Sequence, residues 1–335
     1  MGLAALLSPE HRFSRWLQGW EFEGLVPALA ALAAWPGLLG APGRRAAYAL
    51  ADARGRVNAR FDRDWVSLAL QRPHVSAMTR AALAALLPAG APIEPALRER
   101  YQTLAREEFE TRLLARRGLA PFALQADAAM QQLAERPAGC GLLLLTAHFE
   151  TFMLGVAQLA AQGERVHLVI SRISSDPRLH PAIRAHFAKK YAGIERLLHG
   201  GRLLEIEDHQ RHYYRALKAG EVVVILADAP ALSPEAGVWL PWMGQTRAVA
   251  QGALRLAAST GSALGGFACH HLGGHRHALA LSPLFPPGPG LEQAHEQVFA
   301  FLERHIRQAP ARWWGMHLLP DYPVASEASM EVSNE

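Results

Sequence analysis

The sequence is poor in cysteine and lysine. Its two cysteines, among 335 residues, form no cluster that would indicate a zinc or iron–sulfur centre. Only three of the 34 basic residues are lysine, and there is no compact basic run or recognised nucleic-acid motif. A net charge of +4 permits an anionic partner, but nucleic acid is not expected to be that partner. Hydrophobic residues make up 50% of the chain, which excludes a disordered protein.

The sequence also lacks a long uninterrupted hydrophobic run, and no secretory pattern is present at its N-terminus. The most apolar early segment, residues 25–41, is at the lower limit for spanning a bilayer and contains two prolines. It therefore does not predict a transmembrane helix. Two alternatives stay open: a buried helical hairpin, or a monotopic segment lying on a membrane surface. The second alternative would use three tryptophans as interface anchors, namely Trp16, Trp20 and Trp35.

The chain divides into three stretches with different hydrophobic patterns. Residues 1–135 have helical periodicity, residues 136–322 alternate apolar β-type runs with helical segments, and residues 323–335 form a polar tail that we expect to be disordered. The expected strands are 141–147, 166–171, 221–227, 262–270 and 277–284; the expected helices between and after them are 151–162, 181–192, 206–219, 251–260 and 291–308. This alternation predicts an α/β fold with a central, mostly parallel sheet flanked by helices.

Polar side chains follow the first three of these strands. His148, Arg172 and Asp228 each come within a few residues of a strand end, where the crevice of an open α/β sheet binds its ligands. Neutral histidine is the usual general base near pH 7 and needs a partner to orient its ring. Glu150 and Thr151 are the nearest candidates in sequence. Arg172 suits a phosphate or carboxylate, because its guanidinium can bind either in a bidentate manner.

Several blocks of the sequence resemble one protein family. The blocks are T-A-H-F-E-T-F-M-L-G, S-R-I-S-S-D-P, L-A-D-A-P with V-W-L-P-W-M-G-Q-T, G-A-L-R-L-A-A-S-T-G, and the closing F-L-E-R-H-I-R-Q-A-P-A-R-W-W-G-M-H. In this order and spacing they resemble the late acyltransferases of lipid A biosynthesis, the lauroyl/myristoyl transferases of the lysophospholipid acyltransferase superfamily. The resemblance extends from about residue 25 to residue 317.

The resemblance implies transfer of a fatty acyl chain from an acyl-carrier-protein or CoA thioester to a hydroxyl or amine of a lipid or glycolipid acceptor. It implies no metal or redox cofactor, and a peripheral or monotopic location on the cytoplasmic face of the inner membrane. His148 would be the general base and Arg172 would hold a phosphate or head group. Asp228 lies in a block shared with the family and, with Thr151, is expected to contact substrate. Apart from the resemblance, Trp242 is a candidate wall of an acyl channel, because apolar walls suit a fatty chain; core packing explains it equally well. The absence of a G-x-S-x-G motif disfavours an α/β hydrolase.

The chain departs from the family pattern at two places. The family has a carboxylate where this sequence has Met153, and Leu318 and Leu319 follow the closing histidine where basic residues are expected. Glu150 could supply the missing carboxylate; otherwise a backbone carbonyl or Asp228 would orient the ring. The departures favour an acceptor other than lipid A itself, such as a specialised glycolipid, lipopeptide or pigment-like molecule. They also leave open a catalytically inactive homologue that binds acyl chains or lipid.

Four histidines surround a pair of glycines late in the chain. Metal ligation would require them to converge, usually with a carboxylate or a cysteine. Because they flank the turn between two expected strands, we expect a solvated turn and no metal site. These residues are His270, His271, His275 and His277.

Overall fold

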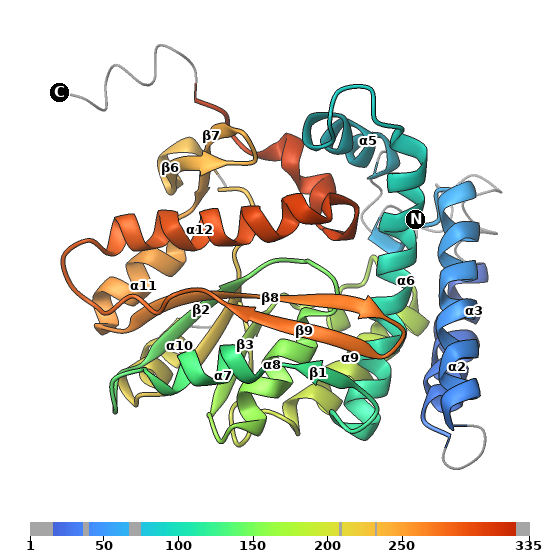
Figure 1. Cartoon of the computed structure of the whole chain (residues 1–335), viewed down its shortest axis with the longest axis horizontal. Helices are drawn as coiled ribbons and strands as arrows, with labels where there is room; N and C mark the ends of the chain where they lie inside the picture. The colour runs from blue at the N-terminus through green and yellow to red at the C-terminus, as the bar shows by residue number, and fades with distance from the viewer. Residues whose placement is uncertain (1–15, 36–39, 67–74, 208–209, 232, 326–335) are drawn as a thin grey trace.

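The computed structural model describes residues 16–35, 40–66, 75–207, 210–231 and 233–325 (Figure 1). Within these ranges the main sheet has seven strands in the order β1-β9-β8-β2-β5-β3-β4. All neighbouring strands are parallel except β8 and β9, which form an antiparallel hairpin. The strands are β1 (Ala123–Gln125), β2 (Leu142–Thr146), β3 (Val166–Ile170), β4 (Leu203–Glu205), β5 (Val222–Leu226), β8 (Ala263–Gly273) and β9 (Arg276–Leu281).

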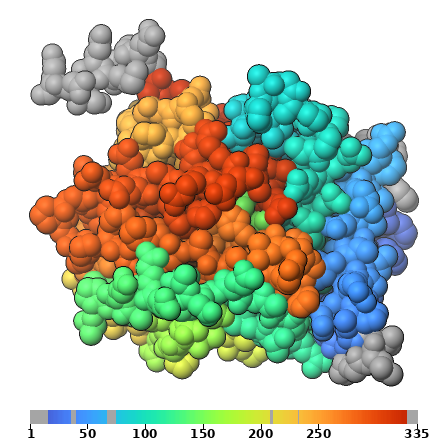
Figure 2. All heavy atoms as spheres, viewed as in Figure 1, coloured from blue at the N-terminus to red at the C-terminus, as the bar shows by residue number. Residues whose placement is uncertain are grey.

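Helices cover both faces of this sheet, so the predicted α/β class with a mostly parallel sheet is confirmed. The helices are α2 (Val26–Ala33), α3 (Gly40–Arg60), α5 (Val75–Leu86), α6 (Ile93–Arg117), α7 (Asp127–Ala134), α8 (Phe152–Ala161), α9 (Pro181–Glu195), α10 (Arg211–Lys218), α11 (Gly252–Thr260) and α12 (Leu291–Gln308). Figure 2 shows α12 lying across one face of the molecule, with α2 and α3 along one side.

The central strand β2 illustrates how the two hydrophobic cores are built. It is a run of leucines buried on both faces, as is typical of a parallel strand covered by helices on each side. Leu142 and Leu144 belong to one core, together with residues of α6, α7, α8 and α9. Leu143 and Leu145 belong to the other, together with residues of α5, α10, α11 and α12. Successive side chains of β2 therefore point to opposite faces of the sheet and pack against the helix layer on each side.

The N-terminal part is helical, and its helices pack on one another through buried ion pairs. Helix α3 lies against α6 (Figure 1), and Arg54 of α3 bonds both Glu21 and Glu108, all three being buried. Arg100 of α6 pairs with Asp64, and both side chains are fully buried. Such pairs hold helices in register at a cost in desolvation. Further along the chain, β1 pairs with β9 and so joins the main sheet.

The structure differs from the sequence-based expectations in local details. Residues 238–246, where the sequence predicts a loop, belong to a separate hairpin of β6 (Gly237–Trp242) and β7 (Gln245–Ala250). The helix expected from residue 206 begins at Arg211. No helix within the described ranges is both long enough and apolar enough to cross a bilayer. Most of the tail expected to be disordered, residues 326–335, lies outside the described residues.

Candidate active site

His148 lies in the turn that joins β2 to α8, at the carboxyl edge of the sheet. The turn is held by the segment after α12. Phe149 forms an isolated antiparallel bridge with Trp313, and the backbone N–H of Glu150 donates to the carbonyl of Arg312 (3.1 Å). The indole of Trp314 packs edge-on against the imidazole, with ring centroids 4.6 Å apart. The His148 side chain remains 28% exposed, so a ligand can reach it.

Asp228 is the partner of His148. It follows β5, which pairs directly with β2, so the two strand ends lie side by side. Asp228 Oδ1 lies 2.9 Å from Nδ1 of His148, and Oδ2 accepts the backbone N–H of the same histidine at 2.8 Å. The indole N–H of Trp313 also donates to Oδ2, at 2.6 Å. Gly315 is needed beside this group, because a Cβ there would lie 2.9 Å from Oδ2.

The electrostatics of this pair favour an ionised aspartate and an oriented imidazole. Asp228 has no exposed surface. Burial by itself raises the pKa of Asp228, but the charge of His148 and the hydrogen bonds from His148 and Trp313 outweigh it, and the pKa lies below its ordinary value. An ionised carboxylate only accepts hydrogen bonds, so Nδ1 of His148 must be the donor. Nε2 then carries the lone pair of the neutral ring and can accept a proton.

Glu150 does not reach Nδ1 of His148, and the alternative partner, Asp228, occupies that position. Glu150 adopts a left-handed backbone conformation (φ 48°), and its buried carboxylate contacts Arg312 Nη1 (3.0 Å) and accepts the backbone N–H of His271 (3.0 Å). Burial raises the pKa of Glu150 to about 7, against the opposing charge of Arg312. Glu150 therefore joins the turn to β8 and lies outside the contacts of the imidazole.

Three residues predicted to contact substrate are buried in structural roles. The Thr151 hydroxyl donates to Glu110 of α6. Trp242 is fully buried and packs against Phe299 and Trp313, which places it behind Asp228 and not in an open channel. Asp228 itself is sequestered by His148 and Trp313. The expectation of direct substrate contact by these three side chains is therefore not supported by their burial.

Arg172 lies at the edge of the candidate site. It follows β3, which is separated from β2 by β5 in the sheet. Its side chain is 46% exposed, and Nε lies 2.6 Å from Glu205 Oε2. The residues on either side of it, Ser171 and Ile173, line the cavity described next. Arg172 is thus separated from His148 by one intervening strand, β5, and lies at the rim of the same cavity.

A cavity of about 270 Å³ adjoins His148. Most of its wall is apolar and comes from the segment after α3, from α6, α8 and α9, from the strand ends and from the segment after α12. The apolar residues are Trp65, Val66, Leu104, Phe152, Met153, Ile170, Phe187, Tyr191, Leu226, Trp314 and Leu318. Its charged wall groups include an ion pair between Lys190 and Glu107 (2.6 Å). His317 also lines it, and burial lowers the pKa of this histidine to about 4. The cavity thus offers mainly apolar walls beside the imidazole.

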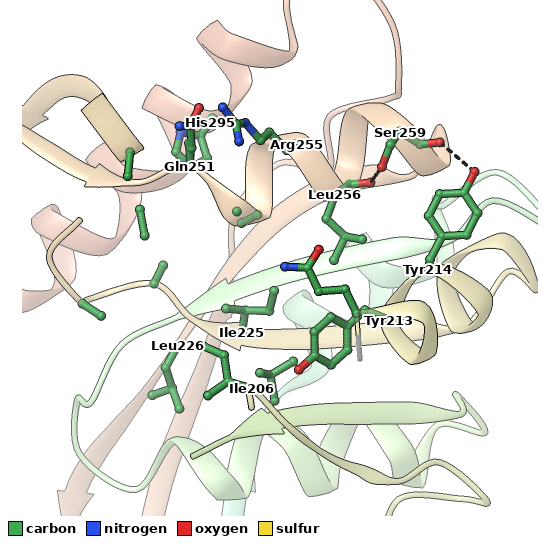
Figure 3. Close-up of a pocket in the computed structure, with 18 of the residues that line it drawn as sticks. Ile206, Tyr213, Tyr214, Ile225, Leu226, Gln251, Arg255, Leu256, Ser259 and His295 are labelled. Atoms are coloured by element: carbon green, nitrogen blue, oxygen red, sulfur yellow. Dashed lines mark hydrogen bonds between the residues drawn. The ribbon is translucent and has the colours of Figure 1, made fainter. Parts of the chain in front are cut away.

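A second, larger cavity of about 960 Å³ opens on the other side of the end of β5 (Figure 3). Tyr213 and Tyr214 of α10 face Leu256 of α11 across it, and Tyr214 donates to the carbonyl of Ser259 (3.3 Å). Leu226 lines both cavities, so the two hollows approach each other beside the strand that leads to Asp228. Its walls come from α10 and α11, from the ends of β3 and β5, and from His295 of α12.

The expectation of a solvated histidine turn is wrong for His277. This side chain on β9 has no exposed surface, and its Nε2 lies 3.1 Å from Glu110 Oε1. The turn is covered because α6 packs over the end of the hairpin, which no local pattern in the sequence reveals. His270, in contrast, contacts His305 of α12 through ring nitrogens 2.8 Å apart.

The sequence was compared with models of protein families and with curated proteins. Residues 97–319 match the model of the bacterial lipid A biosynthesis acyltransferases. The chain belongs to this family. The matched region includes His148, Asp228, the larger cavity, most of the wall of the smaller one and the closing Trp313–Trp314 segment. The family assignment supports acyltransferase activity in general. No individual curated protein matches the sequence.

Proposed function

We propose that this member of the lipid A acyltransferase family moves a fatty acyl chain from a thioester donor to a hydroxyl or amine of a lipid-like acceptor, with His148 as general base. The observation that carries the proposal is the His148–Asp228 pair, whose imidazole lies against an apolar cavity and remains accessible. A cavity of about 270 Å³ is close to the lower end of the usual range for ligand pockets, roughly 300–1,000 Å³, and suits one hydrocarbon chain.

The chemistry follows from the orientation of the ring. With Nδ1–H held by Asp228, Nε2 of His148 takes the proton from the acceptor O–H or N–H as its oxygen or nitrogen attacks the thioester carbonyl carbon. The C–S bond then breaks, and the imidazolium returns the proton to the leaving thiolate. The products are the acylated acceptor and the free thiol of the carrier. Asp228 stabilises the imidazolium that forms between these steps.

Direct transfer is favoured over an acyl-enzyme. Among the described residues, no serine, threonine or cysteine side chain forms a hydrogen bond with His148, which is the arrangement that activates such a nucleophile. Burial raises the pKa of the Cys269 thiol well above its ordinary value, so this cysteine is a poor nucleophile. The acceptor group itself is therefore the nucleophile.

The two cavities divide the substrates between them. The smaller one, with Phe152, Met153 and Leu104 in its wall, holds the acyl chain next to His148. The larger one has the volume for an acceptor and is bordered by Arg211 and Arg255, which suit an anionic head group. Arg172, at the rim of the smaller cavity, binds a phosphate of the donor or acceptor. The donor is an acyl-carrier protein or acyl-CoA.

Membrane contact is proposed to occur through the outer face of α3 at the cytoplasmic side of the inner membrane. Leu50, Val57 and Phe61 are all at least 46% exposed there. Exposed arginines accompany them, at positions 45, 56 and 60. An apolar stripe flanked by arginines is typical of helices that lie on anionic lipid surfaces. Binding to anionic vesicles should fall several-fold in Leu50→Ser/Phe61→Ser. Binding of this variant as tight as that of the parent would contradict membrane contact through this apolar stripe.

The experiment for the proposed reaction uses the purified full chain with long-chain acyl-carrier-protein and acyl-CoA donors. A panel of lipid and glycolipid hydroxyl and amine acceptors is tested with each donor. Acceptor-dependent release of thiol, together with a new acylated product, supports the transferase. Acyl binding without turnover would instead establish an inactive lipid-binding homologue, and release of free fatty acid without acceptor acylation would establish a hydrolase.

A further inference from the structure

Glu110, His271 and His277 converge where the β8–β9 hairpin meets α6 (Figure 1). His271 and His277 are direct cross-strand partners in the hairpin, and Glu110 comes from the helix that covers it. One potential ligand atom from each of the three residues lies within 4.8 Å of the other two. Glu110 and His277 are buried, and His271 is half-buried. A carboxylate and two imidazoles thus share one small volume.

His277 is the unusual member of this group. Its ring has no exposed surface, yet neither Nδ1 nor Nε2 has a hydrogen-bond partner. Nε2 lies 3.1 Å from Glu110 Oε1, so the imidazole and the carboxylate are in ion-pair contact, and Nδ1 has no partner. Buried polar groups without partners are rare, and each requires an explanation such as an ion. A cation between Nε2 and the carboxylate would bind one of the two ring nitrogens together with Glu110.

The other two side chains are held as metal ligands usually are. His271 Nε2 lies 2.7 Å from the carbonyl oxygen of Gly274, so the Nε2–H donates there and leaves the Nδ1 lone pair available. Glu110 accepts hydrogen bonds from the hydroxyls of Tyr48 (2.6 Å) and Thr151. Hydrogen bonds from surrounding groups that fix the ring and the carboxylate are characteristic of ligands at metal sites.

We propose that Glu110, His271 and His277 bind one divalent transition-metal ion of the zinc class. Two imidazoles and one carboxylate form a common ligand set for zinc, which leaves a fourth coordination position for water. The ion would tie the hairpin to α6 and, through Thr151, to the turn that carries His148. None of the three ligands lines the His148 cavity, so the inference stands apart from the proposed acyl transfer.

The test is metal binding by the full chain, without a histidine tag and stripped with a chelator. Zn²⁺ is titrated calorimetrically, and Co²⁺ is used as a spectroscopic probe of coordination. We expect one equivalent of Zn²⁺ per chain and visible Co²⁺ absorption. In His277→Gln and Glu110→Gln, the Zn²⁺ affinity should fall at least about tenfold and the Co²⁺ absorption should disappear. His275→Gln, on the same hairpin but outside the cluster, is the matched control and should bind as the parent does.

Replacing the buried ligands could unfold the protein, so the half-buried His271→Gln is included and the circular dichroism of each metal-free variant is compared. Zn²⁺ should raise the Tm of the parent and of His275→Gln by at least about 3 °C at saturation, but not that of folded His271→Gln. Absence of saturable Zn²⁺ binding by the parent overturns the proposal. Equal affinity of the parent and His271→Gln also overturns it, because the metal would then bind elsewhere.

Discussion

His148 Nδ1 lies 2.9 Å from Asp228 Oδ1, although the two residues are 80 positions apart in the chain. The contact exists because β2 and β5 are neighbours in the sheet, with Thr146 paired to Leu226 at their carboxyl ends. The buried carboxylate of Asp228 accepts hydrogen bonds from the imidazole of His148, from the backbone N–H of His148 and from the indole of Trp313. These bonds hold the imidazole in one orientation. This relationship yields the first prediction.

Asp228→Asn should lower kcat by roughly 10²–10⁴-fold while leaving acyl-chain binding nearly unchanged. The amide no longer stabilises the imidazolium and can hold the ring in the wrong tautomer. Acceptor-dependent thiol release and the dissociation constant for an acyl thioester would be measured in parallel. If the loss appeared mainly as weaker acyl binding, the role of Asp228 in orienting the base would be refuted.

Glu150→Gln is the matched control for that variant. Glu150 is equally buried but contacts Arg312 and the backbone of His271 instead of the imidazole. We expect kcat to stay within a few-fold of the parent and stability to fall by about 1–3 kcal/mol, because a buried ion pair is disrupted. Chemical denaturation and initial rates distinguish the two effects. A loss of kcat as large as that of Asp228→Asn, in folded protein, would contradict this assignment.

Met153→Glu is expected to reduce activity, even though it restores the carboxylate of the family pattern. Met153 is buried in the wall of the cavity beside His148, and Nδ1 already has its carboxylate in Asp228. A carboxylate there meets the apolar acyl chain and costs free energy on burial. The KM for long-chain donors should rise, whereas Met153→Leu should leave it nearly unchanged. A gain in kcat for Met153→Glu would show that the family position still serves catalysis.

The buried histidines predict a loss of stability in mild acid. His295 is almost wholly buried, and burial lowers its pKa from 6.5 to about 4. The unfolded chain therefore binds one more proton than the folded chain between about pH 6.5 and 4 at this site, so the free energy of unfolding falls as the pH falls through that window. The difference is at most one proton, which corresponds to a slope of about 1.4 kcal/mol per pH unit.

Urea unfolding of the parent and His295→Phe at several pH values between about 7 and 4 measures that contribution. The phenylalanine has no proton to gain, so the variant should lose less stability than the parent as the pH is lowered. Parallel curves for the two proteins would mean that His295 does not contribute to the acid sensitivity.

Local patterns identified the residues at the strand ends but not their contacts. His148, Arg172 and Asp228 could be placed at one sheet edge because apolar runs mark where strands end. The pairing of β2 with β5, and not with β3, depends on strand order, and it decides that Asp228 is the residue beside the imidazole. Glu150 was nearer in sequence, but its left-handed backbone directs the carboxylate toward β8.

Other features depended on packing between distant segments. Trp313 contacts Asp228 because the segment after α12 folds back over the turn of His148, a long-range event that the Trp-Trp pair alone does not specify. His277 is buried because α6 covers the hairpin. The larger cavity lies between α10 and α11, and no local sequence pattern predicts how far apart these two helices pack.

The most direct test of the account is the acceptor-dependent consumption of a long-chain acyl thioester by the parent protein and by His148→Gln. Glutamine keeps a polar side chain at this partly exposed position but cannot accept and return a proton at neutral pH. We predict that transfer by folded His148→Gln falls by about 10²–10⁴-fold while acyl binding persists. Acyl transfer at the parental rate in the variant would contradict the central claim that this imidazole is the general base.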